Sequence, residues 1–125
     1  MDKHSFFRSF SFAFAGFISA FKTEQNFKFH LFATFIAIVL AIVLKISPTE
    51  WLWIALSIAL VLGAELMNTA IESLADRVSV EQHPLIRGAK DCAAAAVLLM
   101  AIFALVCGFV IFLPKILKFL SNYVA

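Results

Sequence analysis

Apolar residues fill three long stretches of this chain, and polar residues mark where each stretch ends. Residues 27–46 and 88–113 carry ionisable side chains only near their ends, and 51–76 begins with fourteen uncharged residues. As an α-helix rising about 1.5 Å per residue, each stretch can cross a hydrocarbon core about 30 Å thick. The pattern therefore predicts three membrane-spanning helices.

A fourth helix is predicted before these spans, over residues 5–22. It is amphipathic, because phenylalanines share one face whereas serines, Arg8 and Lys22 fall on the other. The phenylalanines of that face are Phe6, Phe10, Phe14, Phe17 and Phe21. Such a helix is suited to lie in the membrane interface. A secretory signal peptide is the competing interpretation, but polar residues interrupt the apolar stretch that a signal peptide needs.

Composition supports the membrane assignment and excludes other classes of protein. Of the 125 residues, 63% are hydrophobic and 14% are charged, and the mean hydropathy is +0.99. A soluble domain of this size could not bury so much apolar surface. The net charge of +2 is small and scattered along the chain, so nucleic acid is not an expected partner. The sequence thus predicts one all-α membrane domain over residues 1–125. Cys92 and Cys107 lie about 22 Å apart on one predicted helix, so they cannot pair with each other.

Helix boundaries are marked by serine and proline. Ser47 and Glu50 flank Pro48 with the spacing of a capping box, so the second span is expected to begin there. The third span is expected to begin between residues 84 and 91, and Pro114 is expected to end it.

Lysines and arginines are unequally divided between the two sides of the predicted membrane. Seven lie on the side of the N-terminus and the loop at 77–90, against three on the other side. Because cytoplasmic segments carry an excess of positive charge, the N-terminus and this loop are expected in the cytoplasm and the C-terminus outside. We therefore expect a multi-pass protein of the cytoplasmic membrane.

Four polar residues follow the uncharged start of the second span at the steps i, i+3, i+7 and i+11: Glu65, Asn68, Glu72 and Asp76. At about 100° per residue they fall within roughly 60° of arc, so one helix face carries three acids and an amide. An acid within an apolar helix is costly unless it meets a partner, a cation or a water-filled cavity. This acidic stripe is therefore the candidate functional site.

The stripe has the chemistry of phosphoryl transfer. Mg²⁺ prefers one or two carboxylates together with substrate phosphates. Glu65 lies at a depth that a lipid hydroxyl can reach, so it is the candidate general base. Glu72, about 10 Å further along the helix, suits a metal-bound nucleotide arriving from water, and Lys90 could neutralise phosphate. Neither a P-loop nor a GxGxxG motif is present.

Simpler interpretations of the same residues stay open. Glu72 and Asp76 also fit the solvated end of a helix that leaves the membrane, and Asn68 also fits a hydrogen bond between helices. His30 and His83 are expected to be ordinary interface side chains. A small multi-span transporter would also hold an acid in the membrane, but near its midplane. A non-catalytic scaffold would leave the spacing of the stripe unexplained.

Three segments resemble the prokaryotic diacylglycerol kinase family, which comprises small integral membrane lipid kinases including undecaprenol kinases. They are AELMNTAIESLAD at 64–76, GAKDCAAAAVLL at 88–99 and FAGFISAFKTEQNFKFH at 14–30. The resemblance extends over nearly the whole chain. It implies a homotrimer in the lipid bilayer with interfacial active sites, ATP and Mg²⁺ as co-substrates, and a membrane lipid alcohol as acceptor.

The resemblance also implies roles for individual residues. Glu65 corresponds to the catalytic base, and Glu24 and Glu72 correspond to carboxylates that bind the metal. The implied nucleotide contacts are Glu24, Glu72, Glu81, Gln82, His83, Lys90 and Asp91, with Asn68 and Asp76 as supporting polar residues. The expected lipid contacts are Phe14, Phe17, Glu65 and Ala94. Ala94 stands where some members carry a small polar residue.

Two segments bear on the identity of the lipid. EQNFKFH and LPKI look more like the undecaprenol kinase branch than the diacylglycerol kinase branch. The apolar residues that would hold the lipid chain encode little about which lipid it is. The sequence therefore favours transfer of the ATP γ-phosphoryl group to the primary hydroxyl of undecaprenol, with diacylglycerol as the alternative.

Overall fold

The structure, a computed structural model, describes residues 3–78 and 83–124. It contains the helices α1 (Lys3–Thr23), α2 (Gln25–Val43), α3 (Pro48–Val78) and α4 (Pro84–Val124). Of these, α2, α3 and α4 are long and apolar enough to cross a membrane. The structure thus confirms the predicted all-α membrane fold, with one amphipathic helix before three spans.

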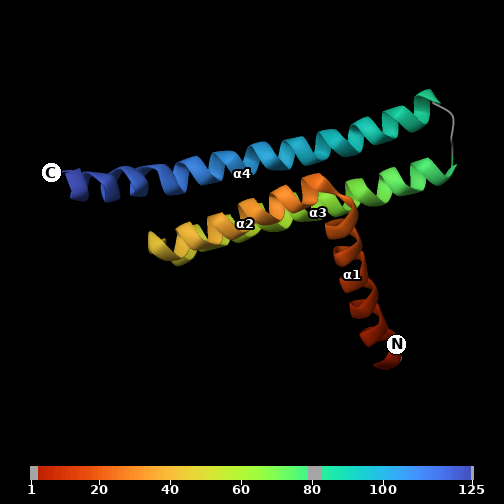
Figure 1. Cartoon of the computed structure of the whole chain (residues 1–125), viewed down its shortest axis with the longest axis horizontal. Helices are drawn as coiled ribbons and strands as arrows, with labels where there is room; N and C mark the ends of the chain where they lie inside the picture. The colour runs from red at the N-terminus through yellow and green to blue at the C-terminus, as the bar shows by residue number, and fades with distance from the viewer. Residues whose placement is uncertain (1–2, 79–82, 125) are drawn as a thin grey trace.

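The three spanning helices lie side by side along the long axis of the molecule, and their chain direction alternates (Figure 1). α3 packs most extensively on α4, and α2 packs mainly on α3. α1 leaves the start of α2 at a steep angle (Figure 1). The end of α3 and the start of α4 extend past the level at which α1 leaves. This is the arrangement expected of an interfacial helix beside spans that project from the membrane.

A single residue, Glu24, separates α1 from α2. Its backbone N–H donates to the carbonyl oxygen of Ala20 at 2.9 Å, and its extended backbone (φ −111°, ψ 113°) begins α2. Just inside α2, the buried ring of Phe27 packs edge-on against Phe17, with ring centroids 5.0 Å apart. These contacts hold α1 at its angle and place Glu24 at the corner between the two helices.

The turn between α2 and α3 contains the predicted capping box. The backbone N–H of Glu50 donates to Oγ of Ser47 at 3.2 Å, and the N–H of Ser47 donates to Oε1 of Glu50 at 2.9 Å. Before it, the N–H of Ile46 donates to the carbonyl oxygen of Ala41 at 3.2 Å and closes the end of α2. Lys45, which lies between the end of α2 and Ser47, has a φ of 52°.

Lys45 is a position at which glycine should stabilise the protein. A residue with a Cβ pays up to about 1–2 kcal/mol for the left-handed conformation, whereas glycine adopts it freely. We expect Lys45→Gly to increase the free energy of unfolding by up to about 1 kcal/mol. The denaturant midpoint of unfolding, measured in detergent, should rise accordingly. Val43→Gly, in the right-handed last turn of α2, is the control and should lower the midpoint. A lower midpoint for both variants would contradict the prediction.

α4 continues through Pro114 to Val124, so the expectation that Pro114 ends the third span is wrong. Proline removes one backbone donor, but within a membrane bundle neighbouring helices and small local adjustments satisfy the carbonyl that it leaves free. Directly after it, Nζ of Lys115 lies 3.2 Å from Oε1 of Glu50. This ion pair joins α4 to the start of α3, so the helical segment beyond Pro114 is held against the bundle.

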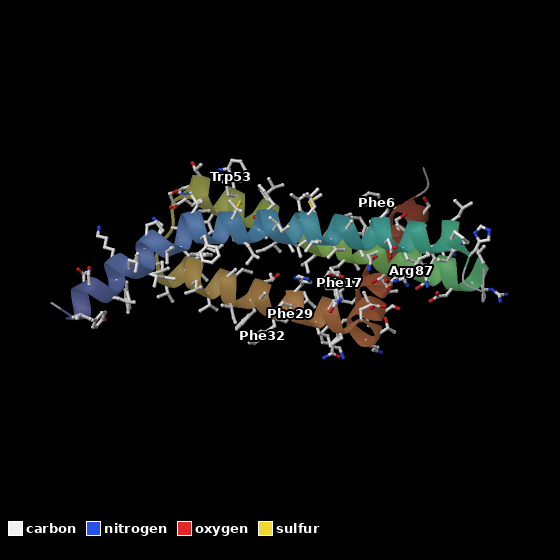
Figure 2. The ribbon with its side chains drawn as sticks, turned by 90° about the horizontal axis from the view of Figure 1, so that it is seen from above. Phe6, Phe17, Phe29, Phe32, Trp53 and Arg87 are labelled. Carbon is white, nitrogen blue, oxygen red and sulfur yellow. The ribbon has the colours of Figure 1, made fainter. Side chains whose placement is uncertain are left out.

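The main buried core lies at the end of the bundle away from α1. It consists of Ala41, Ile46, Ile54, Ile111 and Phe112. Few other residues of the spans are buried within one chain. Phe29 and Phe32, for example, project outward from α2 (Figure 2). The apolar faces that remain exposed suit contact with lipid or with further copies of the chain.

Candidate active site

The side chains of Glu65 and His30 contact each other between α3 and α2. Glu65 is the one ionisable residue that is buried among those the structure describes, with 3% of its surface exposed. Nε2 of His30 lies 3.1 Å from Oε1 of Glu65. His30 is therefore the partner that an acid in an apolar helix requires. The interpretation of His30 as an ordinary interface side chain is corrected.

Two further acids lie close to this pair. The negative charges of Glu24 and Glu72 both act on the carboxyl group of Glu65. Glu24 is half-buried, and within the described residues its carboxylate does not cap the start of α2. Its oxygens are thus not taken up by the helix N-terminus. Glu65 and Glu72 come from α3, and Glu24 comes from the corner between α1 and α2.

Asn68 lies between Glu65 and Glu72 along the same face of α3. Its Oδ1 atom is buried and has no hydrogen-bond partner within the described part of the chain. A buried oxygen without a donor costs about 1–3 kcal/mol. A cation, a ligand donor or a donor from another copy of the chain would remove that cost.

This set of oxygens fits Mg²⁺. Magnesium usually takes one or two protein carboxylates and completes its coordination with water and substrate phosphates. Glu24 and Glu72 can supply the carboxylates, and the unpaired Oδ1 of Asn68 lies on the same face. In residues 3–78 and 83–124, no group of three or more His, Cys, Asp or Glu side chains is placed to hold a metal ion. The donors suit a metal ion that arrives with a phosphate ligand.

Asp76 and Lys90 meet across the ends of α3 and α4, where Nζ of Lys90 contacts Oδ1 of Asp76. Beside them, Nε of Arg87 lies 3.3 Å from Oδ1 of Asp91 one turn along α4. Arg87 marks this end of the molecule in Figure 2. The sequence places these two acids and Lys90 in the functional site, and the structure gathers them at the projecting end of the bundle.

The loop that the resemblance assigns to the nucleotide is described only in part. Glu81 and Gln82 lie outside the described residues. His83 is exposed, and its Nδ1 accepts a hydrogen bond of 3.1 Å from the backbone N–H of Leu85. His83 therefore satisfies one backbone donor at the start of α4.

The expected lipid contacts do not share one environment. Phe14 is 68% exposed on α1, whereas Phe17 turns toward α2 and packs on Phe27 (Figure 2). On α4, Ala94 is exposed and its neighbour Ala93 is buried. Of the four, Phe14 and Ala94 are exposed in a single chain, Phe17 packs on Phe27, and Glu65 is buried.

An apolar cavity of about 620 Å³ lies between α2, α3 and α4. Its polar lining residues are His30, Thr34 and Ser57, and the remainder are alanine, glycine, aromatic and branched aliphatic residues. His30 both lines this cavity and contacts Glu65. The acidic site therefore adjoins an apolar space within the spanning helices.

Comparison with known proteins identifies the family of this chain. The family described as prokaryotic diacylglycerol kinase matches residues 11–112. Undecaprenol kinase of Bacillus subtilis is 40% identical over 115 residues, which cover 92% of this chain and 94% of that protein. A diacylglycerol kinase of Synechocystis is 42% identical over 111 residues, covering 88% of this chain and 63% of that protein. Diacylglycerol kinase of Escherichia coli K12 is 34% identical over 91 residues, covering 73% and 75%. The chain therefore belongs to the prokaryotic diacylglycerol kinase family and is a membrane lipid kinase.

Proposed function

We propose that this protein transfers the γ-phosphoryl group of ATP to the primary hydroxyl of undecaprenol at the cytoplasmic surface of the membrane. The observation that carries the proposal is a buried Glu65 with Glu24 and Glu72 nearby, beside an apolar cavity. The lipid assignment is supported by the similarity to undecaprenol kinase over 94% of that protein. A transporter does not fit a member of this family.

Glu65 acts on the lipid, whereas Glu24 and Glu72 act on the nucleotide. Glu65 accepts the proton of the lipid hydroxyl while the hydroxyl oxygen attacks the γ-phosphorus. The new phosphorus–oxygen bond forms as the bond to the β–γ bridging oxygen breaks, and ADP leaves with that electron pair. Glu24 and Glu72 would hold the nucleotide through Mg²⁺, which would neutralise phosphate charge. Lys90, oriented by Asp76, adds a positive charge at the nucleotide side.

The direct test compares lipids with the purified protein. ATP and Mg²⁺ are supplied with undecaprenol or diacylglycerol in identical detergent micelles, and the phosphorylated lipid is quantified. We expect the larger kcat/KM with undecaprenol. A larger kcat/KM with diacylglycerol would assign the alternative lipid, and phosphorylation of neither would overturn the proposed function.

We further propose that the active form is a homotrimer whose N-terminus faces the cytoplasm. The excess of Lys and Arg beside α1 and the α3–α4 loop supports this orientation. The exposed apolar faces of the spans and the unpaired Oδ1 of Asn68 support contacts with other copies. Native mass spectrometry of the detergent-solubilised enzyme is expected to give the mass of three chains. An active monomer would contradict the trimer.

Phe14 and Phe17 should differ in their effects, because one is exposed and the other packs on α2. Phe14→Leu is expected to raise the KM for lipid and leave the KM for ATP unchanged, since lipid reaches the site past α1. Phe17→Leu should lower stability by about 1 kcal/mol through loss of its aromatic pair. Phe12→Leu, on the opposite face of α1, is the control for Phe14. A lipid KM unchanged by Phe14→Leu would show that α1 only anchors the protein.

A further inference from the structure

We propose that His30 is a positioning residue for Glu65 in the lipid kinase reaction. Its Nε2 lies 3.1 Å from Oε1 of Glu65, which leaves the second carboxylate oxygen, Oε2, for the lipid hydroxyl. This inference rests on the proposed role of Glu65 as general base. It assigns a catalytic purpose to a side chain that the acidic stripe does not include.

The surroundings of His30 favour a fixed orientation. The side chains of His30 and Glu65 are 20% and 4% exposed, so bulk water has little access to either side of their contact. One turn along α2, the hydroxyl of Thr34 donates to the carbonyl oxygen of His30 at 2.7 Å. The ring of Phe29 stands edge-to-face to the imidazole, with centroids 5.6 Å apart. His30 is therefore held from its own helix while it reaches across to α3.

Glu65 needs such a partner for two physical reasons. A glutamate side chain has several rotatable bonds, and losing the productive rotamer misplaces the proton acceptor. The charges of Glu24 and Glu72 also act on Glu65, and like charges repel. Among the described residues, the imidazole of His30 is the group that contacts the Glu65 carboxylate from the opposite helix. It can offset that repulsion and fix the carboxylate in one orientation.

The two carboxylate oxygens of Glu65 therefore have different roles in the reaction. Oε1 is engaged by His30, and Oε2 takes the proton when the O–H bond of the lipid breaks. The lipid oxygen forms its bond to the γ-phosphorus, and ADP leaves with the electron pair of the broken bond. His30 touches neither substrate in this scheme, so its effect passes entirely through Glu65.

The first test replaces the imidazole. We expect His30→Ala to lower kcat by up to about 100-fold, the scale of a misplaced catalytic group, with the KM for ATP unchanged. His30→Gln keeps an N–H donor of similar reach and should recover most of the lost kcat. Ser121→Ala, which removes an exposed hydroxyl that donates to the carbonyl oxygen of Lys118 near the end of α4, is the control and should keep kcat within about twofold.

The second test asks whether His30 acts through Glu65. In a Glu65→Gln background, His30→Ala should cause no further loss of the residual turnover, because the group that it positions is already gone. If the two substitutions lower turnover by factors that multiply, His30 acts independently of Glu65, and the proposal would be overturned. Equal kcat for His30→Gln and His30→Ala, in variants that elute like the wild type on gel filtration, would also overturn it.

Failure of this inference can be told apart from failure of the proposed function. If wild-type protein phosphorylates lipid and Glu65→Gln does not, the role of Glu65 stands. A fully active His30→Ala variant would then exclude the positioning role of His30 and leave the role of Glu65 intact. If the Glu65→Gln variant turns over lipid normally, the proposed general base is wrong, and the positioning role falls with it.

Discussion

Glu65→Gln is expected to lower kcat for lipid phosphorylation by about 100- to 10,000-fold, the range that a general base contributes. Glutamine matches glutamate in shape and can still accept a hydrogen bond from His30, but it cannot take a proton from the lipid hydroxyl. The KM for ATP should change little, because Glu65 lies on the lipid side of Glu24 and Glu72. Steady-state kinetics at saturating lipid and ATP provide the measurement.

Ser57→Ala is the control for this substitution. Ser57 is the other buried polar residue of α3 in the described chain, and its hydroxyl donates to the carbonyl oxygen of Trp53 at 2.9 Å. Removing it perturbs the buried face of the same helix without touching the acids. Near wild-type turnover in a folded Glu65→Gln variant would exclude Glu65 as the base.

Much of the fold could be predicted because its signals are local. Apolar runs of sufficient length predicted the three spans, and the Ser47–Glu50 capping box marked the start of α3. The end of α4 could not be predicted in the same way. Proline disfavours a helix because it lacks the backbone N–H and its ring clashes with the preceding turn, but within a bundle neighbouring helices and local adjustments can satisfy the freed backbone groups. α4 therefore runs on to Val124, and its Lys115 meets Glu50.

The common face of the candidate site could be predicted where one helix carries it, but the contact between two helices could not. The spacing of the acidic stripe follows from helical periodicity alone, so its common face could be read from the sequence. The pairing of His30 with Glu65 depends on the relative register of α2 and α3, which periodicity does not determine. A usable signal did exist. Glu65 required a polar partner, and His30 lies in the first span near the same side of the membrane.

The predicted roles of Glu24 and Glu72 lead to the second large effect. Each should contribute a charge-assisted contact to the metal–nucleotide complex, worth about 1.5–3 kcal/mol. Glu24→Ala and Glu72→Ala are therefore expected to raise the Mg²⁺ and ATP concentrations for half-maximal activity by about 10- to 100-fold. The double variant should have no measurable activity at millimolar Mg²⁺. Titrations of Mg²⁺ at fixed lipid concentration measure the effect.

Glu50→Gln provides the matched control for a lost carboxylate. Glu50 lies at the opposite end of α3, and glutamine can keep the capping hydrogen bond to Ser47. Its Mg²⁺ titration should match the wild type, because its charge lies a full bilayer away from the site. The lipid KM should also stay unchanged in the Glu24 and Glu72 variants, since the lipid contacts lie on the membrane side. If both of those variants kept wild-type Mg²⁺ titrations, the metal ion would have to bind elsewhere, and the division between a lipid-side base and nucleotide-side carboxylates would be wrong.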